Sequence, residues 1–133
     1  MKSSIVSVMI VIGIMGAAGL MIASRAVAET EMPALVKDGG FACAGCHNVD
    51  TKKVGPAWRD VSKFYNGKMD KTATGKTLQE VTGGKSAEDF LVEKISKGGK
   101  GNWMPMPMSP VDPSGAKQAQ IREIAQWILN LEK

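Results

Sequence analysis

The sequence predicts an all-α domain with long loops, for three reasons. Apolar residues near the C-terminus recur three or four residues apart, which is the spacing of one face of a helix: Ile121, Ile124, Ile128 and Leu131. No segment shows the alternation of apolar and polar residues that is typical of a half-buried strand. Glycine and proline gather between the periodic segments, where they interrupt helices. A chain of 133 residues is long enough for one domain and too short for two.

The N-terminus has the layout of an export signal. Lys2 precedes an uncharged, mostly apolar run over residues 3–24, and Ala26-Val27-Ala28 places small residues where a signal peptidase cleaves. We therefore expect residues 1–28 to be a signal peptide cleaved after Ala28, which leaves a domain over residues 29–133. The alternative is a retained membrane anchor, because the apolar stretch of about 18 residues reaches the length of a spanning helix. Both possibilities predict export, either to the periplasm or to a membrane surface that faces it.

Charge and residue counts exclude several classes of function. The 17 basic residues of the chain fall to 15 once Lys2 and Arg25 are removed with the signal, against 13 acidic residues. This balance, without an arginine-rich helix, excludes a nucleic-acid-binding protein. Two cysteines are too few for a disulfide-rich secreted scaffold. A single histidine excludes a zinc enzyme built on several imidazoles.

Four segments of the domain are predicted to be helical, over residues 32–44, 56–65, 87–97 and 114–131. Pro33 suits the first turn of the first segment. Gly98 follows the third segment, in the place where glycine commonly ends a helix. Ser114 is expected to cap the start of the last segment.

Two long segments are predicted to be loops. Residues 66–86 are rich in glycine, lysine and threonine and have few large apolar side chains, so we expect a surface insertion. Residues 101–113 are rich in proline, which excludes a helix and favours an extended backbone. A domain of 105 residues with so little regular structure would have a marginal core by itself. We therefore expect another group to fill its centre.

Both cysteines and the only histidine lie within five consecutive residues, Cys43-Ala44-Gly45-Cys46-His47. The pattern C-x-x-C-H is the attachment signature of a c-type haem. Two thiols at this spacing at a helix end can each bind one vinyl group of the porphyrin, and the next residue then places an imidazole under the iron. We therefore predict one haem c, bound covalently through Cys43 and Cys46, with His47 as a ligand of the iron.

Three other interpretations of the motif are weaker. A redox-active disulfide of the thioredoxin type is expected within a βαβ unit, which this sequence does not predict. A structural zinc site needs four ligands, and the motif supplies three within a cramped pentapeptide. A surface disulfide beside an unrelated histidine is the third alternative.

The second axial ligand of the iron has to be another residue type, because the chain has no second histidine. A methionine thioether is a suitable ligand, and the pairing of histidine with methionine raises the reduction potential of a haem. The candidates are Met69, Met104, Met106 and Met108.

Three further features follow the haem motif along the chain. They are the run Val54-Gly55-Pro56-Ala57-Trp58, the run Trp103-Met104-Pro105-Met106-Pro107-Met108, and an amphipathic C-terminal helix that contains Trp127. In this order they resemble the small bacterial class I cytochromes c, which are short, single-haem electron carriers of the periplasm. The resemblance implies a small cytochrome c fold in which three to five helices and long loops wrap around the haem. In that family the methionine that closes a W-x-P-x-P-M run is the iron ligand, and here this residue is Met108.

The resemblance also implies roles for residues around the iron ligands. The carbonyl of Pro56 would accept the Nδ1 proton of His47 and so fix its tautomer. Trp103 would donate its indole N–H to a haem propionate, and Lys94 would lie near one. The sequence departs from the family at Val111, where short members often have an asparagine that supports the methionine ligand.

These features predict an electron carrier and not an enzyme. With both axial positions occupied by His47 and Met108, the iron has no open position for a substrate, so the expected reaction is one-electron transfer between Fe(III) and Fe(II). The partners would be redox proteins that dock transiently, with Lys52 and Lys53 steering acidic ones, and the carrier would be a monomer. The alternatives are a haem-bearing subunit of a membrane or periplasmic oxidoreductase and, if a small gas molecule displaces Met108, a haem-based sensor.

Overall fold

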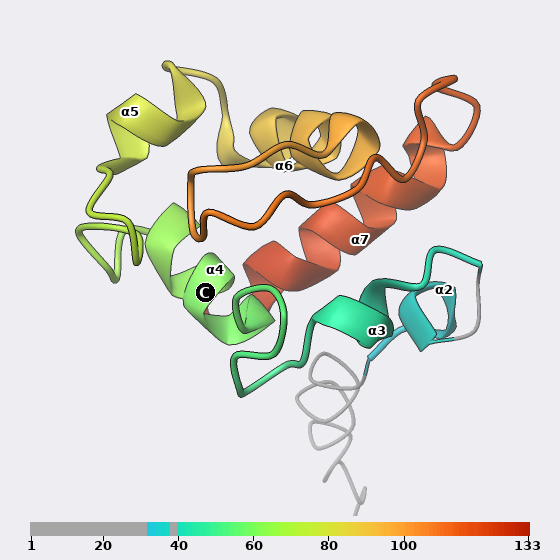
Figure 1. Cartoon of the computed structure of the whole chain (residues 1–133), viewed down its shortest axis with the longest axis horizontal. Helices are drawn as coiled ribbons and strands as arrows, with labels where there is room; N and C mark the ends of the chain where they lie inside the picture. Colours follow the sequence, from blue (N-terminus) through green and yellow to red (C-terminus); the bar gives the residue numbers. More distant parts are fainter. Residues whose placement is uncertain (1–31, 38–39) are drawn as a thin grey trace, which may run out of the picture.

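The structure is a computed structural model that describes residues 32–37 and 40–133. Its helices are α2 (Ala34–Lys37), α3 (Cys43–Cys46), α4 (Trp58–Tyr65), α5 (Leu78–Thr82), α6 (Ala87–Lys97) and α7 (Gln118–Asn130) (Figure 1). The described residues contain no β-strand, so the predicted all-α class is confirmed. The expected signal peptide over residues 1–28 lies outside the described residues. Within the part of the chain that is described, no helix combines the length and the apolar character needed to cross a bilayer.

Helix α7 provides the centre of the core and packs against both α6 and α4 (Figure 1). The periodic face predicted from the sequence is the buried one, with Ile121, Ile124 and Ile128 each at most 3% exposed. Burial of each such side chain contributes about 1.5–3 kcal/mol. Hydrogen bonds join the C-terminal ends of α4 and α7, because Ser62 Oγ and Asn66 Nδ2 both donate to the carbonyl of Leu129, at 3.1 and 2.8 Å.

The start of α7 differs from the prediction, because the helix begins at Gln118 and Ser114 is not its cap. The carboxylate of Asp112 accepts hydrogen bonds from the backbone N–H groups of Ala116 and Lys117, at 3.1 and 2.9 Å. The hydroxyl of Ser114 instead donates to this carboxylate, at 3.2 Å. A carboxylate two residues upstream of the expected cap therefore binds the free N–H groups before the helix, and the Ser114 expectation was wrong.

The expected helix over residues 32–44 is divided into α2 and α3. Gly40 and Ala42 both have left-handed backbone conformations, with φ of 77° and 52°. A right-handed helix cannot continue through such residues. The division lets α3 take its own direction, and it brings Phe41 into the core, where the side chain is 7% exposed.

The other two helices agree closely with the sequence. Helix α4 begins at Trp58 rather than at 56, because Ala57 before it is still extended. Helix α6 has the predicted bounds, with the hydroxyl of Ser86 accepting a hydrogen bond from Asp89 N at 3.1 Å. Gly98 ends it with φ of 69° and ψ of −143°, a combination that only glycine adopts readily.

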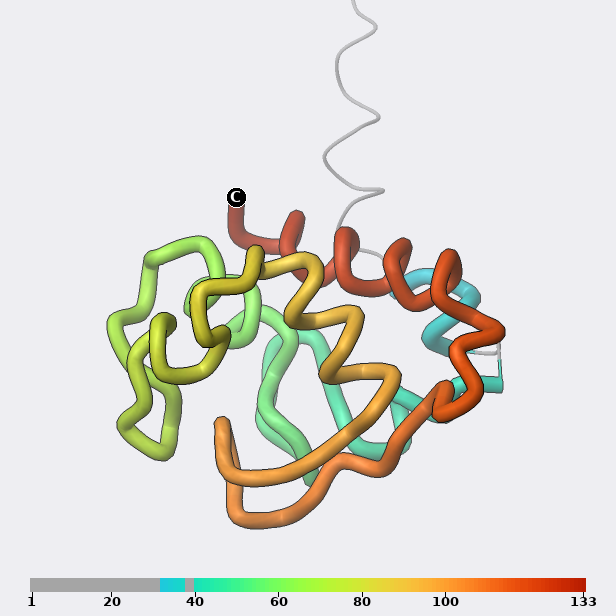
Figure 2. Tube along the Cα trace, turned by 90° about the horizontal axis from the view of Figure 1, so that it is seen from above, coloured from blue at the N-terminus to red at the C-terminus, as the bar shows by residue number. Residues whose placement is uncertain are grey.

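The two predicted loops are both ordered segments. Residues 66–86 contain α5, whose N-terminus has a capping box formed by Thr77 and Glu80, and they bury Thr72 and Val81. Because of this helix and the division of 32–44, the described residues contain six helices, whereas three to five were expected. The proline-rich segment is extended as predicted, and in the view of Figure 2 it runs along the opposite side of the molecule from α7.

Candidate functional site

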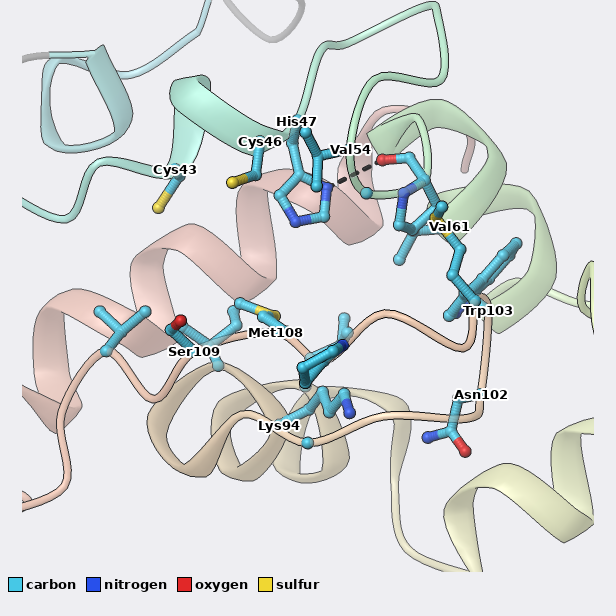
Figure 3. A pocket seen from close by; sticks show the side chains of 18 of the residues that line it. Cys43, Cys46, His47, Val54, Val61, Lys94, Asn102, Trp103, Met108 and Ser109 are labelled. Carbon is cyan, nitrogen blue, oxygen red and sulfur yellow. Dashed lines mark hydrogen bonds between the residues drawn. The ribbon is translucent and has the colours of Figure 1, made fainter.

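A cavity of about 490 Å³ lies at the centre of the structure, enclosed by α3, α4, α6 and the loops that follow α3 and α6 (Figure 3). Its size falls in the range of about 300–1,000 Å³ that is common for cofactor sites. Much of its lining is apolar. Every site residue predicted from the sequence lines this cavity: Cys43, Cys46, His47, Pro56, Trp103 and Met108.

The two thiols lie at one end of the cavity, on the short helix α3 (Figure 3). Cys46 is exposed and Cys43 is half-buried, and neither forms a disulfide. Burial raises the pKa of the Cys43 thiol. Among the described residues, no group of three or more cysteine, histidine or acidic side chains could hold a metal ion, so the zinc alternative has no support. Both sulfur atoms are placed for reaction with a group that enters the cavity.

The imidazole of His47 is fixed by its surroundings. Its Nδ1 donates to the carbonyl of Pro56 at 2.9 Å, so the lone pair is on Nε2 and faces the cavity (Figure 3). Burial lowers the pKa of His47, and the Pro56 hydrogen bond opposes this shift. The ring stacks on Trp58, with centroids 5.4 Å apart and planes 15° apart. A neutral, oriented imidazole is the form that binds a metal ion.

Gly55 allows this arrangement, a role that was not predicted from the sequence. A Cβ at this position would lie 2.3 Å from Cε1 of His47, which is closer than any real contact. The backbone N–H of Gly55 donates to the carbonyl of Cys46 at 2.7 Å, which holds the loop against the haem motif. Its place in the V-G-P-A-W run was the available signal, because glycine is required where backbone and side chain approach this closely.

Met108 reaches the cavity from the side opposite to His47 (Figure 3). Its backbone forms two hydrogen bonds with Gly99, N–H to carbonyl in each direction and each 2.9 Å long. Gly98 lies so close to this pair that a Cβ there would be 2.2 Å from the carbonyl oxygen of Met108. Of the other candidates, Met106 lines the cavity but is 58% exposed, Met104 lines it with its carbonyl bonded to Gly101 N at 3.0 Å, and Met69 is not among the lining residues. Among the three methionines of the cavity wall, Met108 is the one whose backbone is hydrogen-bonded in both directions.

Trp103 and Tyr65 lie together on the cavity wall. A hydrogen bond from the Trp103 indole to the Tyr65 hydroxyl partly offsets the effect of burial, which raises the pKa of Tyr65. The Trp103 ring also meets Phe64 edge-on, with centroids 5.4 Å apart. The predicted contact between Trp103 and a propionate stays a prediction. Lys94 lines the cavity as well, and burial followed by repulsion from Lys76 lowers its pKa.

Comparison with known proteins gives a consistent result. The sequence matches the family described as cytochrome c over residues 33–132, which is most of the chain. The chain belongs to the cytochrome c family.

Among the relatives of this cytochrome c is cytochrome c-552 of Hydrogenobacter thermophilus, which is 32% identical over 123 residues, covering 92% of this chain and 96% of the relative. Cytochrome c-551 of Pseudomonas denitrificans is 37% identical over 93 residues, covering 68% of this chain and 88% of the relative. The crystal structure of Nitrosomonas europaea cytochrome c552 superposes with a TM-score of 0.51 at 33% identity, over 69% of this chain and 91% of that one.

Membership of this family confirms the predicted cofactor and activity. Cytochromes c carry a haem bound covalently through two cysteines, and Cys43 and Cys46 have the required spacing. They are electron carriers, and this cytochrome c is one. The cavity between α3 and Met108 fits this group, because it places two thiols at one end and an imidazole on one wall.

Proposed function

We propose that this cytochrome c is a periplasmic carrier of single electrons in which His47 and Met108 are the two axial ligands of the haem iron. The bound haem supplies the Fe(III)/Fe(II) couple. The observation that carries the proposal is the position of the two side chains, which enter one cavity from opposite walls (Figure 3).

The surrounding residues keep the ligands in place in both oxidation states. Pro56 and Trp58 hold the His47 ring, and Gly99 holds the backbone of Met108. With His47 and Met108 as its ligands, the iron of a bound haem would have no position open to a substrate. These residues would therefore support electron transfer without any bond between the iron and a substrate, which is the work of a carrier and not of an enzyme.

The rim of the cavity provides the surface for redox partners. Val54 and Met106 line the cavity and are 43% and 58% exposed, and Cys46 is exposed beside them. An exposed apolar rim allows close, short-lived contact with another redox protein. Lys52 is exposed and is available to steer acidic partners, whereas Lys53 Nζ donates to the carbonyl of Ala44 at 2.9 Å and also stabilises the haem motif. The carrier acts as a monomer.

The proposed carrier is exported from the cytoplasm. The layout of residues 1–28 supports a signal peptide cleaved after Ala28, and the domain over 29–133 would then acquire its haem outside the cytoplasm. Mass spectrometry of the purified protein tests this: the N-terminus is expected at Glu29 with the mass of one haem added. A mass that includes residues 1–28 would instead support a membrane-anchored carrier.

The axial ligands are tested by optical spectra of the oxidised and reduced protein. The wild type is expected to show a low-spin spectrum with the weak sulfur-to-iron band, and Met108→Ala is expected to lose that band. Met106→Ala is the matched control, because this methionine lies two residues away and is 58% exposed, and it is expected to keep the band. Loss of the band in Met106→Ala but not in Met108→Ala would contradict the assignment. A high-spin wild type that binds carbon monoxide would contradict the carrier itself.

A further inference from the structure

The lysine-bearing segment 66–86 is attached to the wall of the haem cavity. Thr74 Oγ1 donates to the carbonyl of Asn102 at 2.6 Å, and Lys76 Nζ donates to Asn102 Oδ1 at 3.4 Å. Asn102 itself lines the cavity. The segment is therefore joined to the cavity wall, although it lies more than 25 residues away in the sequence, and it is more than a surface insertion.

The backbone of Lys76 is held in place by two hydrogen bonds with Thr72. Thr72, which is 5% exposed, donates its N–H to the carbonyl of Lys76 at 2.9 Å, and its hydroxyl accepts from Lys76 N at 3.2 Å. The next residue, Thr77, begins the capping box of α5. Two hydrogen bonds hold this short turn. A lysine on such a turn loses less conformational freedom when its ammonium group binds a ligand than a lysine on an open loop does.

A second ammonium group, that of Lys94 in α6, lies near the corner of the cavity formed by Asn102 and Lys76. Lys94 lines the cavity, and its Nζ lies 3.3 Å from the position that a Cβ would have at Gly99. Repulsion between Lys76 and Lys94 adds to burial in lowering the pKa of Lys94. Two like charges beside an apolar cavity are unfavourable unless an anion lies between them.

The other charged groups around this corner do not place an anion in the cavity. Lys100 lines the cavity and adds a third positive charge. Glu80 is negatively charged and interacts with Lys71 and Lys76, but it is exposed, is not among the lining residues and is bonded to Thr77 by two hydrogen bonds of 2.8 Å. The corner is thus positively charged and faces the cavity.

The chemistry of the haem indicates which anion belongs there. Its two vinyl groups and its two propionates lie on opposite halves of the macrocycle. The cysteines that bind the vinyl groups lie at one end of the cavity, and Asn102 lies across it from Cys43 (Figure 3). A haem bound through both cysteines would therefore have its propionates on the Asn102 side.

We infer that segment 66–86 supplies Lys76, which together with Lys94 neutralises a haem propionate and raises the reduction potential. The inference rests on the proposed carrier with one haem. A positive charge near the haem favours the reduced state, because reduction adds one negative charge to the centre. The effect of Lys76 is strengthened by the apolar cavity, which screens charges less than water does.

The test is the midpoint potential of the holoprotein in three variants. Lys76→Met is expected to lower the potential, and Lys76→Arg, which keeps the charge, is expected to restore it. Lys68→Met is the matched control: it removes the same charge from the same segment, but Lys68 is exposed and interacts with Glu132 near the C-terminus. Its shift is expected to be smaller and to vanish at high ionic strength, while the shift in Lys76→Met persists.

Equal shifts in Lys76→Met and Lys68→Met, or no shift in either, would overturn the inference. Thr74→Val is a fourth variant, which changes no charge but removes the hydrogen bond to Asn102, and it is expected to lower the potential by less than Lys76→Met. A potential unchanged in Thr74→Val would overturn the role of the attachment. Failure of the carrier proposal is recognised separately, because the wild type would then lack the low-spin histidine–methionine spectrum from the start.

Discussion

The imidazole of His47 is enclosed so closely that position 55 has no room for even a methyl side chain. Pro56 holds one edge through Nδ1, Trp58 covers one face, and the backbone of Gly55 passes against the ring. Trp58 in turn meets Trp127 edge-on, with centroids 5.1 Å apart, so the position of the imidazole depends on α7. Each of these contacts limits the rotation of the ring and keeps Nε2 directed into the cavity.

Gly55→Ala is therefore expected to displace the imidazole. A Cβ would lie 2.3 Å from Cε1 and 2.7 Å from Nδ1 of His47. The ring cannot move away without breaking its hydrogen bond to the carbonyl of Pro56. We expect the low-spin spectrum to weaken or disappear and the melting temperature to fall. Gly45→Ala is the control, because nothing lies within 4 Å of a Cβ there. An unchanged spectrum in Gly55→Ala would show that the loop moves aside and that the close approach is not required.

At the scale of single residues, the sequence predicts the candidate iron ligands and the Pro56 support of His47, and the structure places all of them around one cavity. Cys43, Cys46 and His47 are identified by spacing alone, and the run that ends at Met108 has few alternatives. Gly55 and Gly99 act through contacts with His47 and Met108, eight and nine residues away in the chain, and the only sequence signal was the place of Gly55 in the V-G-P-A-W run. Their roles could be seen only in the folded structure.

The start of α7 depends on the side chain of Asp112, which was not predicted as a helix cap. The carboxylate of Asp112 accepts hydrogen bonds from Lys117 N, Gln118 Nε2, Ser114 Oγ and Ala116 N, at 2.9 to 3.2 Å. Burial works against its charged form, but these hydrogen bonds outweigh burial and lower the pKa of Asp112. The carboxylate thereby joins the proline-rich segment to α7.

Asp112→Ala is expected to destabilise the protein more than Ser114→Ala. The first change removes the acceptor for two backbone N–H groups, whereas the second removes one donor to the carboxylate. Thermal unfolding of the two variants at neutral pH gives the comparison. A larger loss in Ser114→Ala would restore the serine as the cap and contradict the role of Asp112.

The carboxylate of Asp112 also makes the stability of the protein depend on pH, with a definite sign. Because the folded-state pKa of Asp112 is lowered, its stabilising effect is complete above the ordinary aspartate value of about 3.9 and is lost as the pH falls through the lower, folded value. The difference in stability between wild type and Asp112→Ala is therefore expected to shrink on acidification. A difference that stays constant from neutral pH down to about pH 2 would contradict this linkage.

At the scale of elements, long periodic helices were predicted well and short ones were not. Helix α6 and the buried face of α7 follow from apolar spacing. Helices α2, α3 and α5 have 4, 4 and 5 residues, too few for any periodic pattern to be recognised. Their positions are set by left-handed residues such as Ala42 and by tertiary contacts, which composition does not reveal.

The whole molecule combines a continuous apolar core with the cavity that adjoins it. Helices α6 and α7 bury apolar side chains against each other, but α3, the loop after it and the proline-rich segment line the space of about 490 Å³. The cavity is partly open and much of its lining is apolar, so without a bound group this apolar surface would face water, which is unfavourable. The cofactor is thus a structural part of the molecule as well as its redox centre.

A chain that cannot bind haem is therefore expected to lose its fold. In the double variant Cys43→Ala/Cys46→Ala, thermal unfolding followed by circular dichroism should show reduced helicity and no cooperative transition, because the residues around the cavity lose the surface against which they pack. The single variant Cys46→Ala keeps one thioether and is expected to retain a cooperative transition at a lower temperature. Its comparison with the double variant separates the loss of haem from the loss of a cysteine. A double variant that unfolds cooperatively at the wild-type temperature would mean that α4, α6 and α7 form a sufficient core by themselves, and that the cavity is only a binding site.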